Sequence, residues 1–234
     1  MLACGKGHND VVTLLLDYSD IIELNARDND GWTALMYICM NGHKYIIQLL
    51  LELSHTSIDV NARSVGSGRT ALHFACSERH KDVVKLLLKY SEDRNIDLNI
   101  KDIGGLTAFM EACDSGHKDI VHLLLKFSEY KNIDLNAIDN NGWTAFMIAC
   151  HSEHKDVVQL LELLEYSKER NIDLNIKHGN GFTAFMIACY FGHKGIVQLL
   201  LQYSNVIDIN IAANVTLSKE INDLLLPHPK KRKY

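Results

Sequence analysis

The chain has 234 residues, 47% of them hydrophobic and 23% charged, and a formal net charge of −5 at pH 7. Four positive charges lie in the tail Lys230, Lys231, Arg232 and Lys233, so the rest of the chain stands near −9, and a body this acidic argues against nucleic-acid binding. The sequence contains no apolar run long enough for a transmembrane helix and no start typical of a secretion signal, so no membrane contact is expected.

A Thr-Ala pair followed by large apolar side chains recurs five times along the chain. The copies begin at Thr33, Thr70, Thr107, Thr144 and Thr183, at spacings of 37, 37, 37 and 39 residues. Self-similarity at a fixed period of this size is typical of stacked-repeat proteins. The pattern therefore predicts an all-α solenoid in which each copy packs against its neighbours.

Each copy predicts two antiparallel helices and a turn. The Thr can cap a short apolar helix of about nine residues, which is too short to be stable alone in water. A His such as His117 then opens a second helix, whose apolar residues recur at i, i+3 and i+4, as in Ile120, Leu123 and Leu124. A short extended segment and a Gly-containing turn, 139–142 after this copy, lead to the next Thr.

The repeats form one array that fills the chain up to residue 226. Its parts are a half repeat at 1–25, full repeats near 26–61, 62–99, 100–136, 137–175 and 176–210, and a closing helix at 211–226, followed by a basic tail at 227–234. Residues 2–8 align with 111–117, so the first repeat lacks most of its first helix, which leaves one flank of the helix at 11–18 uncovered. Three explanations stay open: Met1 is an internal start, the chain is a fragment, or another surface covers this flank.

The motifs of each copy resemble the ankyrin repeat. They run Asp-x-x-Gly-x-Thr-Ala-Leu, then Ala-Cys-x-x-Gly-His, then Ile-Val-x-Leu-Leu-Leu and a closing Asp-Leu-Asn. The usual Thr-Pro-Leu-His of that family is replaced by Thr-Ala-Leu/Phe-Met in four copies and by Thr-Ala-Leu-His, ending at His73, in one. The resemblance covers nearly the whole chain and implies an ankyrin solenoid with short hairpin tips. It further implies a monomer that binds another protein without catalysis.

The connection after each second helix is longer than in most ankyrin repeats. The family period is about 33 residues, and the extra residues here follow the second helix, as in 89–95. This connection is rich in Tyr-Ser and charge, and with the Ile-Asp-Leu-Asn after it resembles the large ankyrin families of giant DNA viruses that infect amoebae. That resemblance implies a viral protein whose partner is a host protein.

Six cysteines lie four residues before six histidines, which superficially offers metal sites. The cysteines are Cys4, Cys39, Cys76, Cys113, Cys150 and Cys189, and the histidines are His8, His43, His80, His117, His154 and His193. Each pair supplies half of a tetrahedral site, and neighbouring repeats stack about 10 Å apart, beyond the reach of a disulfide or a shared metal shell. We therefore expect no metal, no cofactor and buried reduced thiols, which indicates an intracellular, reducing compartment such as the cytoplasm. The ankyrin resemblance implies that the histidines bond backbone groups near the start of the second helix.

An Asn closes the extended segment of each repeat. The six positions are Asn25, Asn61, Asn99, Asn136, Asn175 and Asn210. We expect these side chains to hydrogen-bond the backbone between adjacent turns. In the ankyrin family this Asn can be a substrate of an asparaginyl hydroxylase, which the resemblance allows for Asn61 in Asp59-Val60-Asn61.

No catalytic motif accompanies the repeats, since the sequence has no phosphate-binding Gly loop, no Gly-x-Ser-x-Gly turn and no His-Glu-x-x-His. We therefore predict a protein-binding module rather than an enzyme. Three alternatives stay open: a metal-dependent role, a nucleic-acid or nuclear-import adaptor acting through the basic tail, and a truncated, nonfunctional paralogue. The tail after Pro229 resembles a monopartite nuclear import signal, and its competing role is to keep the chain soluble.

The predicted binding surface combines the turn tips with the exposed side of the first helices, where the copies differ most from one another. The ankyrin resemblance implies that these parts form one concave face. The predicted partner-binding residues are Trp32, Met40, Arg69, Leu106, Trp143, His151, Phe182, Tyr190 and Phe191. Trp, Tyr and Arg are the residue types that most often carry interface energy. The competing interpretation is that Trp32, Trp143 and Phe182 merely cover the neighbouring turn.

Overall fold

A computed structural model of the chain describes residues 1–18, 22–52, 58–162, 172–211 and 217–225. The first helices of successive repeats are α1 (Leu2–Gly5), α3 (Ala34–Asn41), α5 (Ala71–Ser77), α7 (Ala108–Asp114), α9 (Ala145–His151) and α12 (Ala184–Phe191). The second helices are α2 (Asn9–Leu16), α4 (Lys44–Glu52), α6 (Lys81–Lys89), α8 (Lys118–Phe127), α10 (Lys155–Glu162) and α13 (Lys194–Gln202), and α14 (Lys219–Leu225) closes the described part. Apart from an isolated bridge between Ile138 and Thr144, these residues form no strand, which confirms the predicted all-α class.

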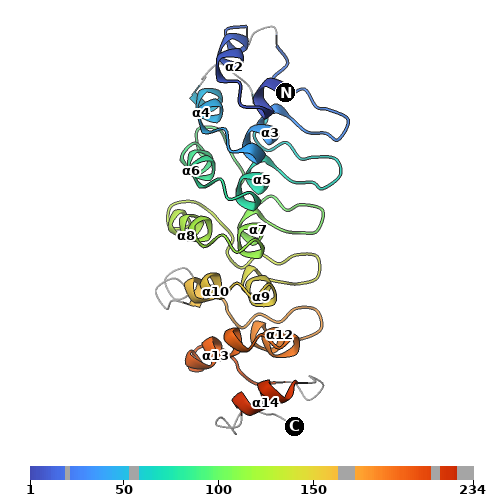
Figure 1. The fold of residues 1–234 in the computed structure, drawn as a ribbon, viewed down its shortest axis with the longest axis vertical. Helices are drawn as coiled ribbons and strands as arrows, with labels where there is room; N and C mark the ends of the chain where they lie inside the picture. Colours follow the sequence, from blue (N-terminus) through green and yellow to red (C-terminus); the bar gives the residue numbers. More distant parts are fainter. Residues whose placement is uncertain (19–21, 53–57, 163–171, 212–216, 226–234) are drawn as a thin grey trace. The chain divides into compact units, whose positions relative to one another are not determined.

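The helices belong to two compact units. Unit 1 consists of Met1–Ala112 with Lys131–Ile133, and unit 2 of Cys113–Tyr130 with Asp134–Tyr234, so that the boundary falls within α7. Within each unit, the two helices of a repeat pack side by side and corresponding helices of neighbouring repeats stack, as α3 does on α5 and α9 on α12 (Figure 1). Among the described residues, no helix is long and apolar enough to cross a membrane.

A Thr caps the first helix of the full repeats, as predicted. The Thr33 Oγ1 accepts a hydrogen bond from the Met36 N–H at 3.4 Å, which satisfies one of the free donors of the first turn. The same bond recurs at Thr107, Thr144 and Thr183. The copy at Thr70 has its own arrangement, described below.

The turn before the first helix is organised by its Asp. Asp28 Oδ1 accepts the backbone N–H groups of Asp30 and Trp32 at 3.0 and 2.8 Å, and the Asp28 N–H donates to the Trp32 carbonyl at 3.0 Å. The Tyr37 hydroxyl donates to Asp28 Oδ2 at 2.6 Å, and this bond, together with the Trp32 N–H, lowers the pKa of Asp28. Gly31 lies in the left-handed region, with φ of +73°, which explains the glycine of this turn.

The histidine at the start of the second helix joins neighbouring repeats. Its Nε2–H donates to a carbonyl at the end of the preceding repeat's first helix, so the partner is a backbone group, as predicted, but one that belongs to a neighbouring repeat. The bonds are His43 to Gly5 at 2.9 Å, His80 to Met40 at 2.9 Å, His154 to Asp114 at 2.6 Å and His193 to His151 at 2.8 Å. The last carbonyls of a short helix lack intrahelical partners and attract this donor. The ring passes so close that a Cβ on Gly42 would lie 2.4 Å from His80 Nδ1.

Asn25, Asn61, Asn99, Asn136 and Asn175 bond the backbone of the next repeat, which confirms the prediction for five of the six positions. Asn61 Oδ1 accepts the Asp97 N–H at 2.9 Å, and its Nδ2 donates to the Asn95 carbonyl at 2.8 Å. In unit 2, Asn175 repeats this pair of bonds with the Asp208 N–H and the Val206 carbonyl, at 2.6 and 2.9 Å. Five of the six asparagines therefore tie one extended segment to the next, whereas the Asn210 amide donates to Asp208 of its own segment.

The long connection after the second helix also has a structural role. Arg94 lies in this connection, and its guanidinium donates to the Leu51 carbonyl from Nε at 3.0 Å and from Nη2 at 2.6 Å. Leu51 lies in the last turn of α4, whose carbonyls have no partner within the helix. The arginine therefore caps the second helix of the preceding repeat.

Cysteine side chains fill one position of the apolar core. Cys39, Cys76, Cys113, Cys150 and Cys189 are buried, as predicted, whereas Cys4, in the incomplete first repeat, is half-buried, and none of the six forms a disulfide. Burial raises the pKa of the Cys39 and Cys76 thiols, and raises that of Cys189 to about 12. These thiols stay protonated at neutral pH and act as small apolar side chains.

The repeat that begins at Thr70 contains a buried polar network in unit 1. The Thr70 N–H donates to His73 Nδ1 at 3.2 Å, and His73 Nε2–H donates to the Leu106 carbonyl at 3.0 Å. Arg69 forms an ion pair with the buried Glu111. The other full repeats have Met in place of His73.

Two predicted parts lie at the edge of the described chain. The closing helix, predicted at 211–226, is observed as α14, and Ser218 Oγ accepts the Ile221 N–H at its start, at 3.3 Å. Lys230, Lys231, Arg232 and Lys233 lie outside the described residues.

We expect α2 to open before the other helices of unit 1. Val12 is the buried residue of α2, whereas α4 buries Ile46, Ile47, Leu50 and Leu51. Because little apolar surface holds α2 in place, its amides will exchange with deuterium faster than those of α4 and α6. Equal protection of α2 and α4 in a hydrogen-exchange experiment at neutral pH would contradict this expectation.

Protonation of His73 will destabilise the fold in mild acid. Burial lowers the pKa of His73, so the native state favours the neutral ring. Its contribution to the free energy of unfolding is complete above the unfolded pKa of about 6.5 and is lost as the pH falls through the lower folded pKa.

The matched variant is His73→Met, which places there the residue of the other repeats. Urea unfolding of both proteins at several pH values between neutral and mildly acidic will show a smaller loss of stability for the variant. An equal loss in both proteins would show that other groups cause the acid sensitivity.

Candidate partner-binding surface

The predicted binding residues lie at two places in the repeats. Directly before the capping Thr are Trp32, Arg69, Leu106, Trp143 and Phe182, which are half-buried. At the end of the first helix are Met40, His151 and Tyr190 at one position and Phe191 at the next, all exposed. The contacts that these side chains make differ between the two units.

In unit 1, Trp32 packs mainly against this chain's own side chains. Its ring centroid lies 4.3 Å from that of Phe74 and 5.0 Å from that of Tyr37. Met36, Ala62 and Phe74 form the buried cluster beneath it. Trp32 therefore covers the next repeat, in line with the competing interpretation of this residue.

Arg69 and Leu106 are tied into the polar network of unit 1. The Arg69 guanidinium pairs with Glu111, and its Nε lies 3.9 Å from Asp102 Oδ2. The Leu106 carbonyl accepts the bond from His73. Both residues therefore help to hold the fold of unit 1.

In unit 2, six aromatic rings form a closed circuit of contacts, which we call the aromatic cluster. In order around the circuit they are Trp143, His151, Phe191, Tyr190, Phe182 and His178. Neighbouring centroids are separated by 5.2, 4.6, 5.1, 6.1, 5.5 and 5.7 Å, the last closing the circuit from His178 to Trp143. Such ring pairs contribute beyond the area they bury.

The sequence profile described as "Ankyrin repeats (3 copies)" matches residues 1–102, 50–139, 94–171 and 130–213 of the chain. The chain belongs to the ankyrin-repeat family. Ankyrin repeats are in general non-catalytic modules for protein–protein interaction. The stacked helix pairs described above are the ankyrin fold.

Individual relatives match a short part of this ankyrin chain. Inversin from Danio rerio is 44% identical over 52 residues, 22% of this chain and 5% of the relative. "Probable E3 ubiquitin-protein ligase XBOS33" from Oryza sativa subsp. japonica is 47% identical over 49 residues, 21% of this chain and 9% of the relative. "NAD-capped RNA hydrolase NUDT12" from Homo sapiens is 43% identical over 51 residues, 21% of this chain and 11% of the relative. The match thus spans about a tenth or less of each of these proteins.

His178 is the member of the aromatic cluster that the sequence prediction missed. It stands where the preceding ankyrin repeat has Asp139. Its Nδ1 accepts the Asn180 N–H at 3.0 Å, as Asp139 Oδ1 accepts the Asn141 N–H at 2.8 Å. The imidazole therefore keeps the turn in shape and adds a ring beside Trp143. Its replacement of the usual Asp was the signal in the sequence that could have identified it.

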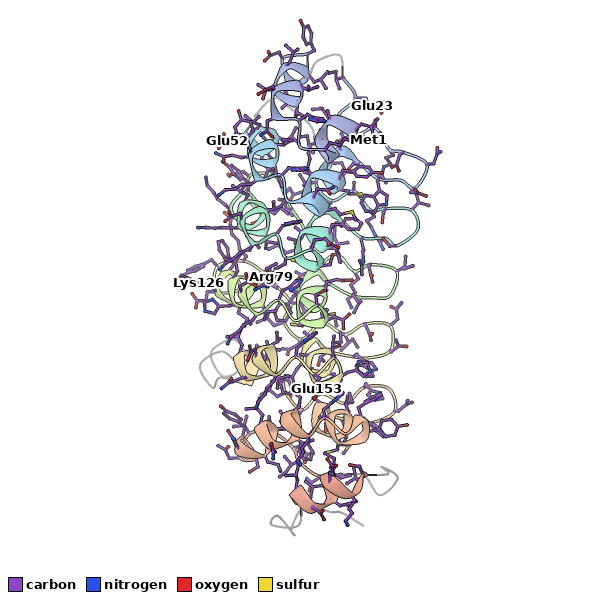
Figure 2. All side chains as sticks on the ribbon, viewed as in Figure 1. Met1, Glu23, Glu52, Arg79, Lys126 and Glu153 are labelled. Carbon is purple, nitrogen blue, oxygen red and sulfur yellow. The ribbon has the colours of Figure 1, made fainter. Side chains whose placement is uncertain are left out.

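A histidine and a carboxylate border the aromatic cluster. The His193 ring stacks on Phe191 with centroids 6.0 Å apart, and its Nδ1 lies 3.5 Å from Glu153 Oε2. Glu153, labelled in Figure 2, has φ of +58° where most repeats have Gly, and its side chain is 61% exposed. Burial lowers the pKa of His178, while the Asp139 carboxylate acts in the opposite direction.

The described residues contain no group of three or more His, Cys, Asp or Glu side chains that could hold a metal ion. At the aromatic cluster, the surface of unit 2 consists of partly exposed rings beside carboxylates. Surfaces of this kind are typical of protein interfaces, in which aromatic residues are enriched.

Proposed function

We propose that the chain is a protein-binding module that engages a partner through the turn tips and the ends of the first helices, without catalysis and without a cofactor. The aromatic cluster is the observation that carries this proposal. Tyr190 and Phe191 are 54% and 49% exposed. They contact each other, and each also contacts one further ring of the circuit, Phe182 and His151 respectively. Contiguous exposed aromatic surface marks interaction sites.

The predicted residues take different parts in this proposal. Trp143, His151, Phe182, Tyr190 and Phe191 form the anchor in unit 2. The residues of unit 1, namely Trp32, Met40, Arg69 and Leu106, contribute the surrounding contact, because three of them are already held by the chain's own side chains or backbone.

The partner is proposed to be a host protein bound by a monomeric, intracellular chain. The resemblance of the long connections to the ankyrin families of giant viruses of amoebae supports a host protein as partner. The free, buried cysteines support a reducing compartment.

Asn61 offers a second kind of partner, an asparaginyl hydroxylase. Both polar atoms of its side chain are hydrogen-bonded to the next repeat. Such an enzyme would therefore have to displace the segment around Asn61 from Asn95 and Asp97 before reaching the side chain.

Alanine substitutions in the aromatic cluster test the proposed function. A partner captured with the unaltered chain will bind Trp143→Ala and Tyr190→Ala at least tenfold more weakly, since truncating an interface anchor costs roughly 2 kcal/mol. Urea unfolding midpoints should change little for Tyr190→Ala, whose side chain is half exposed.

The matched control is Tyr45→Ala. Tyr45 is a tyrosine of similar exposure, 51%, but it lies on a second helix, α4. Its removal should leave affinity unchanged. Equal affinity of all three variants, or affinity lost only in step with stability, would refute this surface as the site.

The basic tail supports a separate proposal, nuclear import. Four consecutive basic residues, 230–233, follow Pro229 at the end of the chain. A reporter fused to residues 227–234 will become more nuclear than the bare reporter, and replacing the four basic residues with Gln will reverse this. Fluorescence microscopy that finds no enrichment would leave solubility as the role of the tail.

A further inference from the structure

The aromatic cluster of unit 2 also indicates the chemistry of the group that docks on it. Its six rings come from the tip residues Trp143, His178 and Phe182 and from the helix ends His151, Tyr190 and Phe191. Each ring contacts two others. His178 is buried, Trp143 and Phe182 are half-buried, and His151, Tyr190 and Phe191 are exposed, so five contiguous rings reach the surface.

We propose that the aromatic cluster receives a positively charged side chain, arginine or lysine, from a basic segment of the partner protein. This inference rests on the proposed function and specifies the partner's chemistry. Cations are attracted to the electron-rich faces of aromatic rings, most strongly to that of Trp and more often through Arg than through Lys.

The local charge favours a cation over an anion at this place. Glu153, beside His193 at the border of the cluster, keeps an exposed carboxylate. Asp139 lies in the turn between Ile138 and Trp143, close enough to act on His178. An approaching basic segment would therefore be drawn towards the rings and paired at their border.

The cluster is also free of this chain's own cations. Among the described residues, the cation that stacks on an aromatic ring belongs to unit 1, where Lys89 Nζ lies 4.7 Å from the centroid of the Tyr90 ring. No lysine or arginine of the described chain stacks on the six rings of the cluster. Since burial lowers the pKa of His178, this ring stays neutral at pH 7 and does not repel a cation.

A comparison between repeats supports the same assignment. At the position of Trp143 and Phe182, the repeat that begins at Thr70 has Arg69, whose guanidinium is neutralised by Glu111. Unit 1 thus supplies its own cation and satisfies it internally. In unit 2 the same position supplies rings and leaves the cation to the partner.

The test uses the two tryptophans of the full-length chain, with Trp143 as the reporter of the site and Trp32 as the control. Acetyl-Gly-Arg-Gly-Arg-Gly-amide is titrated to millimolar concentration while the indole N–H signals are followed by NMR, with Trp143→Phe assigning them. The Trp143 signal will shift and saturate, and the Trp32 signal, from a ring stacked on Phe74, will stay in place. Tyr190→Ala will weaken the binding at least fivefold, and Tyr45→Ala will not.

A second peptide with citrulline in place of arginine keeps the shape and the donors but lacks the charge. It should bind at least fivefold more weakly. Equal binding of the two peptides, equal shifts of both tryptophans, or no shift at all would overturn the inference. If binding of a captured partner depends on Trp143 but is unchanged after the partner's basic residues are replaced with Gln, the proposed function stands. The inference that a cation docks on the cluster would then be refuted.

Discussion

The shortness of the first helices is the constraint on which the rest of the structure depends. The full repeats have first helices of seven or eight residues, below the length at which an isolated helix is stable in water. Their order must therefore come from neighbouring repeats. Buried apolar contacts supply most of it, and two polar ties set the register: the His ring on the preceding helix end and the Asn side chain on the next extended segment. Each such bond contributes only about 1 kcal/mol, but it recurs along the chain.

Local features of the fold could be predicted from the sequence, and features set between repeats could not. The Thr caps, the turn Asp and the buried Cys follow from the chemistry of a few adjacent residues. The partner of His80 lies 40 residues away, so the sequence predicted a backbone partner but not the repeat that supplies it. The Arg94 cap on α4 was missed for the same reason, since its acceptor is 43 residues away. The described part of the closing helix begins after Ser218, whose hydroxyl caps it, which the apolar pattern alone did not indicate.

The candidate surface was predictable as a set of positions but not as a set of contacts. Trp32 and Trp143 occupy equivalent positions and look alike in the sequence. The next repeat offers Phe74 to Trp32, whereas the repeat after Trp143 has Ile187 at the corresponding position, and His178 becomes the ring beside Trp143. Variation between copies located the surface, and the side chains of the following repeat decided whether a ring became part of the core or of an exposed cluster.

The bonds that His43, His80, His154 and His193 form between repeats run in one direction. Each ring donates backwards, to a helix that precedes it in the chain, as His43 does to Gly5 and His193 to His151. During synthesis the N-terminal repeat emerges first, so an acceptor is already present when each new ring leaves the ribosome. The bonding order thus follows the order of translation within each unit, and an ankyrin array of this kind can be completed one repeat at a time, with each new layer docking on a surface that is already formed.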